Sequence, residues 1–238
     1  MKVAIIFIGT NRYLDFLPRY YEHIEKHFLP KSEKVFLVFT DGEMEDLPDN
    51  IKVYNQKHLE WPYITLKRFE IINKARQDIE KCDWLVFLDA DTLVVDNIKE
   101  EEFFSDKPYF GVHHPCHALK MQPHTEYPGA FETNTNSRAG VTEDDDTSMY
   151  YQGCLWGGKV PEVLEMIDEL DSRVEEDLSN DVIAVWHDES QLNKFYSEVK
   201  EDVHLLGPEY AYPEVFKDHC NFPPKIVHLA KDNSAYQI

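Results

Sequence analysis

Hydrophobic residues in this chain gather in short continuous runs that end in polar loops. The first run ends in Gly9-Thr10-Asn11 and the second in Thr40-Asp41-Gly42. Continuous apolar runs of about four to eight residues, bounded by turn residues, predict strands that are buried on both faces of a parallel sheet. Four such runs cover residues 3–8, 35–39, 51–54 and 84–88.

Segments of helical periodicity separate these runs. Apolar residues recur at helical spacing from Leu17 to Phe28, and again from Thr65 to Ile79, where we expect one helix. Strands that alternate with helices predict an α/β fold with a mostly parallel central sheet. Ligands bind such sheets beyond the carboxyl ends of the strands, so Thr10, Asp41 and Asp89 should share one edge.

The run from Trp84 to Leu88 leads directly into Asp89-Ala90-Asp91. Side chains two residues apart on an extended chain point the same way, with about 7 Å between their Cα atoms. Asp89 and Asp91 can therefore share one divalent cation. Without a counter-ion, two carboxylates at the end of a buried strand would repel each other strongly. The pattern predicts a site for Mg²⁺ or Mn²⁺.

Three interpretations of this short pattern compete. In many proteins Asp-x-Asp is only a solvated loop end. In phosphohydrolases of the haloacid dehalogenase type it opens the active site, and Asp89, Asp91 and Thr92 fit that motif. In GT-A glycosyltransferases it holds a metal on the donor diphosphate. The phosphohydrolase interpretation weakens because the motif follows the fourth predicted strand, and because the later acidic cluster, Glu143 to Asp146, has polar flanks that predict a solvated loop.

Composition narrows the choice of partners. The chain has 238 residues, of which 42% are hydrophobic, enough for one substantial core. A formal net charge of −21 repels nucleic acid and anionic membranes, so a nucleotide would need a metal and basic residues at its site. The N-terminal apolar run is too short for a membrane span or a signal peptide. Four widely spaced cysteines predict free thiols, and we expect a cytoplasmic protein.

The second half of the chain carries candidate sugar contacts. A strand at 109–112 leads into His113-His114 and a long polar stretch ending at Met149, which we expect to form an acceptor-binding lobe. Tyr150 to Gly158 combines aromatic residues with glycines, a composition typical of sugar contacts. A core strand broken by glycines explains that segment equally well.

The segment Trp186-His187-Asp188-Glu189-Ser190 opens a predicted helix. We expect Asp188 to be the N-cap, with Gln191 completing a capping box. Glu189 then lies in the first turn, where the helix dipole favours an ionised carboxylate. Capping alone would explain the two acids, but Trp186 and His187 beside them favour a sugar subsite.

With these residues the chain resembles glycosyltransferase family 6, the retaining α-1,3-galactosyl- and N-acetylgalactosaminyltransferases that include the histo-blood-group A and B enzymes. The resemblance extends from Ile6 to Lys231 and is most specific in Trp186 to Lys194, WHDESQLNK. The segment from Tyr150 to Gly158 also matches. A weaker resemblance to glycosyltransferase family 8 would add His228 as a metal ligand.

The family 6 resemblance implies a GT-A fold, a single domain with one Rossmann-like nucleotide-binding unit. Residues of about 1–112 would bind the donor, and about 113–238 would form the acceptor-binding and catalytic part. The implied reaction is retaining transfer of GalNAc or galactose from a UDP-sugar, in α-1,3 linkage, to a galactoside that can carry fucose. The anchor and stem of vertebrate members have no counterpart here, so we expect a bacterial or phage-type member.

The resemblance also implies the roles of individual residues. Asp89 and Asp91 would hold Mn²⁺ or Mg²⁺ on the diphosphate, and Glu189 would be the nucleophile-like catalytic carboxylate. Gln152 and Cys154 would line the pocket that selects the donor sugar. The acceptor would contact His114, Trp186 and Glu189. The whole donor-binding set would be Ile8, Gly9, Thr10, Tyr13, Arg68, Asp89, Ala90, Asp91, Gln152, Gly153, Cys154, Asp188 and Lys231. A phosphohydrolase, and a carbohydrate-binding protein without turnover, stay open as alternatives.

Overall fold

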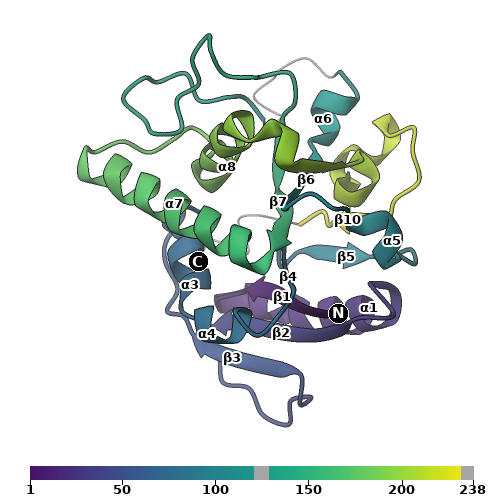
Figure 1. The fold of residues 1–238 in the computed structure, drawn as a ribbon. Coiled ribbons are helices and arrows are strands. Elements are labelled where there is room, and N and C mark those ends of the chain that lie inside the picture. The colour runs from purple at the N-terminus through teal and green to yellow at the C-terminus, as the bar shows by residue number, and fades with distance from the viewer. Residues whose placement is uncertain (121–128, 232–238) are drawn as a thin grey trace.

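The computed structural model describes residues 1–120 and 129–231, which form an α/β fold around one large sheet (Figure 1). The strands of this sheet are β1 (Lys2–Ile8), β2 (Glu33–Thr40), β3 (Ile51–Asn55), β4 (Trp84–Leu88), β6 (Tyr109–His113), β7 (Tyr151–Lys159) and β8 (Val203–Leu206). Their order is β3-β2-β1-β4-β7-β6-β8. All four apolar runs of the first half form strands, as predicted.

Most of the sheet is parallel. Strands β3, β2, β1 and β4 run in the same direction, with Val3 opposite Lys34 on one side and Trp84 on the other. Strand β7 is antiparallel to both of its neighbours and places Leu155 opposite Leu88. The carboxyl ends of the four parallel strands therefore share one edge, and the start of β7 adjoins it.

Helices cover both faces of the sheet. The α-helices are α1 (Leu17–His27), α2 (Tyr63–Leu66), α3 (Arg68–Asn73), α4 (Arg76–Ile79), α5 (Glu100–Phe103), α6 (Pro115–Ala118), α7 (Val160–Ser179) and α8 (His187–Glu198). Four 3-10 helices are also described: η1 (Asn11–Phe16), η2 (Lys200–Asp202), η3 (Pro208–Ala211) and η4 (Glu214–His219). None of the described helices is both long enough and apolar enough to cross a bilayer.

The alternation of side chains along β1 divides the core into two layers. Val3, Ile5 and Phe7 pack on the face covered by α1. Ala4 and Ile6 point to the opposite face, where α3, α7 and α8 pack (Figure 1). All five side chains are fully buried, and each fully buried valine-sized or larger apolar group contributes roughly 1.5–3 kcal/mol. This double-sided core fixes the positions of the strand ends.

The predicted single helix from Thr65 to Ile79 is wrong, because the chain forms α2, α3 and α4 in its place. Helical geometry is interrupted at Lys67 and Ala75, whose ψ angles are 15° and 11°. The segment is rich in β-branched residues, which lose side-chain freedom in a helix and weaken its continuity. The interruption at Lys67 directly precedes Arg68, which turns toward the carboxylates described below.

The acidic stretch after residue 142 is also more ordered than predicted. Asp145 accepts a hydrogen bond from Nζ of Lys194 at 2.6 Å, and the side chain of Asp145 is 8% exposed. Asp146 pairs with Lys200. The loop is therefore held against α8 by ion pairs, although Glu143 and Asp144 are exposed as expected for a solvated segment. All four cysteines are free, as predicted.

A small second sheet connects the end of the chain to the end of β4. Its strands are β5 (Thr92–Val94), β9 (Tyr212–Pro213) and β10 (Ile226–His228), in the order β5-β10-β9. Strand β10 is antiparallel to β5 and pairs His228 with Thr92. This pairing brings His228 and Lys231 to the Asp-x-Asp motif, more than 130 residues earlier in the sequence.

Candidate active site

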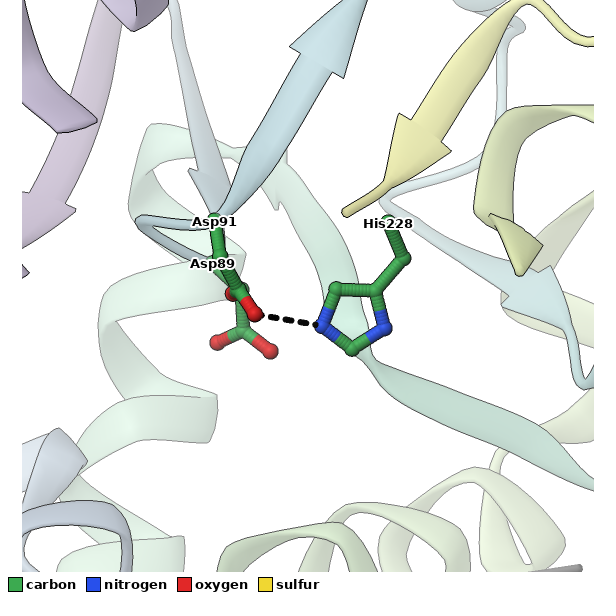
Figure 2. A group of neighbouring side chains, drawn as sticks. All are labelled: Asp89, Asp91 and His228. Carbon is green, nitrogen blue, oxygen red and sulfur yellow. Dashed lines mark ion pairs between the residues drawn. The ribbon is translucent and has the colours of Figure 1, made fainter. Parts of the chain in front are cut away.

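Two carboxylates and one imidazole meet where the main sheet adjoins the small one. Asp89 follows β4 directly, Asp91 precedes β5, and His228 is the last residue of β10. Figure 2 shows the three side chains converging, and their ligand atoms lie within 4.8 Å of one another. The Nε2 atom of His228 is 3.1 Å from Oδ2 of Asp91.

This group fits a divalent cation. Carboxylate oxygens are preferred by Mg²⁺ and Mn²⁺, and an imidazole nitrogen is a further ligand for transition metals. In residues 1–120 and 129–231, no second group of three such side chains is close enough to hold a metal. A metal site at Asp89 and Asp91 is therefore possible, as predicted. The structure adds His228, which only the weaker family 8 resemblance had suggested.

Asp91 is held as a carboxylate in a buried position. Its side chain is almost fully buried, and Nζ of Lys231 also donates to Oδ2. Burial alone would raise the pKa of Asp91, but His228 and Lys231 outweigh it and hold the pKa well below its usual range. The Lys231 ammonium also lies 5.2 Å from the ring centre of Tyr13. Lys231 and Tyr13, both in the predicted donor-binding set, therefore lie beside the metal group.

Arg68 connects the metal group to α8. Its Nη2 is 3.0 Å from Oδ1 of Asp89, and its Nη1 is 2.5 Å from Oδ2 of Asp188. The guanidinium also lies 4.4 Å from the ring centre of Phe87 and donates to the carbonyl of Gly153. Burial raises the pKa of Asp188 to about 6, against the opposing charge of Arg68. One buried cation thus fixes Asp89 relative to Asp188.

The predicted capping role of Asp188 is wrong. Helix α8 begins at His187 with Trp186 in the N-cap position, and no side chain caps it. Asp188 lies inside the first turn and binds Arg68, while the Nε2 of Gln191 donates to Asp177. A buried guanidinium attracts the carboxylate more strongly than an exposed backbone N–H would. Asp188 and the neighbouring Glu189 therefore both face the interior of the site.

Glu189 has both carboxylate oxygens occupied by donors. The Tyr150 hydroxyl donates to Oε1 at 2.8 Å, and the backbone N–H of Gly153 donates to Oε2 at 2.7 Å. Glycine at 153 permits this approach, because a Cβ there would lie 3.1 Å from Cβ of Glu189. Burial raises the pKa of Glu189 to about 7, although the two donors oppose the shift. Near neutral pH this carboxyl can gain or lose a proton.

A cavity of about 290 Å³ opens beside these groups, at the carboxyl edge of the sheet. The metal group lies at its floor. Its lining includes eight of the predicted donor-binding residues: Ile8, Thr10, Tyr13, Arg68, Asp89, Ala90, Asp91 and Lys231. Thr10, Asp41 and Asp89 share the carboxyl edge of the sheet, as predicted. Thr10 and Asp89 line the cavity, whereas Asp41 accepts a hydrogen bond from the N–H of Asn11 and lies outside the lining.

The other predicted donor-binding residues lie beside the cavity and outside its lining. Gly9 packs on Phe7, where a Cβ would be 2.4 Å from the ring. On β7 the carbonyl of Cys154 accepts a hydrogen bond from the N–H of Asp89. Gln152 has a buried Oε1 with no hydrogen-bond partner among the described residues. This unsatisfied acceptor is available to a ligand hydroxyl group.

The predicted acceptor residues differ in exposure. Trp186 is partly exposed, and its buried Nε1 has no partner within the described part of the chain. His114 is only 2% exposed and lies edge-on to Tyr150 at 5.6 Å between ring centres. Burial lowers the pKa of His114 to about 3, so its ring is neutral. In this structure the buried His114 ring packs against the Tyr150 ring and supports its position.

Sequence reasoning missed a part of the cavity wall. The missed lining residues are His58, Trp61, Ile64, Thr65 and Phe87. Most of them follow β3, and the rule that places ligands beyond the carboxyl ends of strands could have indicated that segment. The chain after β3 has no apolar periodicity, however, so the pattern of hydrophobic residues gave no position for it.

Comparison with known proteins agrees with this geometry. The chain is 29% identical to the O-antigen biosynthesis glycosyltransferase WbnI of Escherichia coli, over 99% of this chain and 97% of that protein. It is 26% identical to histo-blood group ABO system transferase 2 of Rattus norvegicus, over 96% of this chain and 68% of that protein. It is 27% identical to globoside alpha-1,3-N-acetylgalactosaminyltransferase 1 of Gallus gallus, over 95% of this chain and 65% of that protein. The family model for glycosyltransferase family 6 matches residues 1–235. The chain therefore belongs to glycosyltransferase family 6.

Proposed function

We propose that this glycosyltransferase moves GalNAc or galactose from a UDP-sugar to a galactoside acceptor, in α-1,3 linkage and with retention of configuration. The observation that carries the proposal is the buried connection from Asp89 through Arg68 to Asp188, with Glu189 next in sequence. It supports the proposal because the metal group, which would hold a diphosphate, is joined through Arg68 to a carboxylate that would bind a sugar. The similarity to the globoside alpha-1,3-N-acetylgalactosaminyltransferase of Gallus gallus supports the α-1,3 linkage and GalNAc.

The diphosphate end of the donor would bind at Asp89, Asp91 and His228. A bound Mn²⁺ or Mg²⁺ there would neutralise the negative charge that develops on the departing UDP. Lys231, already within reach of Asp91, would contribute a second positive charge to the same leaving group. The charge of the whole protein makes both contributions necessary, because the chain otherwise repels an anionic donor.

The sugar end of the donor would lie between Arg68 and α8. Asp188 would accept hydrogen bonds from the sugar hydroxyls while Arg68 fixes its orientation. Glu189 would face the anomeric carbon and stabilise the positive charge that develops there when the bond to UDP breaks. The unsatisfied Oε1 of Gln152 would accept a hydrogen bond from the donor sugar, and Nε1 of Trp186 would donate one to the acceptor.

The identity of the donor sugar depends on a small region of β7. Gln152 and Cys154 would contact the substituent that distinguishes GalNAc from galactose. A difference of one methyl-sized group in such a pocket changes specificity by roughly 1–3 kcal/mol. We favour UDP-GalNAc, with UDP-galactose as the second choice and a fucosylated galactoside as acceptor.

One experiment tests the function. The protein is incubated with Mn²⁺ and a panel of UDP-GalNAc, UDP-galactose and UDP-GlcNAc, with and without galactosides that carry fucose. We expect UDP release that depends on acceptor, and a trisaccharide product whose new linkage is α-1,3 by NMR. Release of inorganic phosphate in place of transfer would support the phosphohydrolase alternative. Donor binding without any release would support a carbohydrate-binding protein.

A further inference from the structure

The cavity has two chemically different ends along the edge of the sheet. Asp89 and Asp91 follow β4, while Thr10 follows β1, the next strand. Strand β3 lies two further positions away, at about 4.8 Å per strand. His58, only three residues beyond β3, nevertheless contacts Thr10. The chain after β3 therefore crosses the end of β2 and lines the cavity beside Thr10.

Thr10 and His58 form a hydrogen-bonded pair in the wall of this second end. The Oγ1 of Thr10 is 2.9 Å from Nδ1 of His58, and Thr10 is 3% exposed. The N–H of Tyr13 donates to the carbonyl of Thr10, which fixes its backbone. The pair is therefore held in place from the Thr10 side.

The second ring nitrogen of His58, Nε2, has no hydrogen-bond partner within residues 1–120 and 129–231. The ring lines the cavity, and its exposure is intermediate. A neutral imidazole whose Nδ1 accepts from the threonine hydroxyl carries its proton on Nε2. Its Nε2–H group can then donate a hydrogen bond to the carbonyl oxygen of a ligand in the cavity.

The uncharged residues that line the same cavity suit a flat heterocycle. Ile8 and Ile64 are apolar, and Trp61 and Tyr13 are aromatic. The acidic and basic side chains at the charged end belong to the metal group or to its neighbours Arg68 and Lys231. A diphosphate would occupy the charged end, so the base of the same nucleotide must extend toward the uncharged one.

We infer that the Thr10–His58 pair reads the polar edge of the donor's nucleobase, with Nε2–H of His58 donating to a pyrimidine carbonyl oxygen. Thr10 is the positioning residue, and His58 is the residue that contacts the ligand. The inference rests on the proposed function, because it takes the donor to be a uridine diphosphate sugar. It assigns base recognition to a residue outside every motif that the sequence displays.

Calorimetric titration with UDP and with pyrophosphate, both with Mn²⁺, separates the base contact from the diphosphate contact. His58→Asn keeps an amide near the position of Nδ1 and removes Nε2. We expect it to weaken UDP binding about tenfold and to leave pyrophosphate binding unchanged. Thr10→Val keeps the shape of the side chain without its hydroxyl, and should weaken UDP binding by a smaller factor. Lys57→Ala, which changes the neighbouring side chain outside this cavity, is the matched control and should bind both ligands like the parent.

Two outcomes overturn the inference. UDP affinity of His58→Asn equal to that of the parent would exclude a base contact. Equal loss of UDP and pyrophosphate affinity would show that His58 only supports the fold of the loop. Failure of the proposed function gives a different result. The parent protein itself would then bind UDP no more tightly than pyrophosphate, or would bind neither ligand.

Discussion

At the scale of single residues, Glu189 has the surroundings of a catalytic carboxylate. Its two oxygens accept from Tyr150 and Gly153, and no cation pairs with it among the described residues. A purely structural glutamate in such a place would be expected to have a positive partner, because burying a charge without one is unfavourable. The missing positive charge is what a developing oxocarbenium ion would supply.

Glu189→Gln is therefore expected to impair the reaction far more than the fold. Glutamine keeps the shape and can still accept from Tyr150, but it cannot stabilise a positive charge. Such stabilisation is typically about 3–4 kcal/mol, so kcat should fall by a factor on the order of 10² to 10³. Initial rates and UDP-sugar affinity of the variant are measured against the parent, and Glu22→Gln on the exposed side of α1 is the control. Turnover within about tenfold of the parent would place the catalytic carboxylate elsewhere.

A second residue-scale prediction concerns pH. Burial raises the pKa of Glu189 from 4.5 to about 7, so its charged form is complete only above that value. We expect kcat to rise with pH through about 7. Tyr150→Phe removes a hydrogen bond that lowers this pKa, so the acid limb should move to higher pH by roughly 0.5–1 unit, equivalent to about 1 kcal/mol. An unchanged limb in the Tyr150→Phe profile would show that Glu189 does not control it.

The residue-scale site was only partly predictable from the sequence. Asp188 and Glu189 stand out in WHDES, yet the orientation of Asp188 depends on Arg68, which is 120 residues away. Local rules favoured a cap because they cannot include a distant guanidinium. His58 carries no motif at all, and only the fold-back after β3 brings it to Thr10.

At the scale of elements, one carboxylate joins α7, α8 and the loop before β7. Asp177 is 3% exposed and accepts from the Ser137 hydroxyl and the Arg138 N–H, both at 2.6 Å. The Nε2 of Gln191 donates to it at 2.8 Å. Three separate segments therefore depend on a single acceptor group near the C-terminal end of α7.

Asp177→Ala should be strongly destabilising, because it leaves several buried donors without partners. Each buried donor left without a partner destabilises the fold by roughly 1–3 kcal/mol, so we expect the free energy of unfolding to fall by about 3–4 kcal/mol. Urea unfolding of the variant measures this. Asp168→Ala is the control: Asp168 is on the same helix as Asp177, makes an exposed ion pair with Arg76 of α4, and should change stability by less than about 1 kcal/mol. Similar losses of stability in both variants would show that Asp177 does not hold the three segments together.

Some elements of the fold have a clear hydrophobic pattern in the sequence, and others do not. Continuous apolar runs located β1, β2, β3 and β4 to within about two residues, because burial on both faces leaves few alternatives. The segment from Tyr150 to Gly158 was ambiguous in the sequence, and the structure shows that it contains a core strand, β7, whose Gly153 N–H donates to Glu189. Helices α2 to α4 were predicted as one because apolar periodicity continues across the breaks at Lys67 and Ala75.

At the scale of the whole molecule, a net charge of −21 must be reconciled with an anionic donor. The described positive groups at the cavity floor are few, and Arg68 is already paired with Asp89 and Asp188. Diphosphate and the two acidic motif residues would repel each other without a cation between them. Metal and UDP should therefore bind with positive coupling, each raising the affinity of the other.

Asp91→Asn tests that coupling across the whole protein. In the parent, Mn²⁺ with UDP at about 100 times its dissociation constant should stabilise the fold by about 2.7 kcal/mol, which raises Tm by roughly 5–10 °C. Asparagine keeps the volume of Asp91 but removes the charge that holds the metal, so the Mn²⁺-dependent part of this increase should disappear. Asp41→Asn is the control, because Asp41 lies at the same sheet edge but outside the cavity. Full transferase activity of Asp91→Asn in chelator, or an undiminished Tm increase with Mn²⁺ and UDP, would show that the donor binds without the Asp-x-Asp metal.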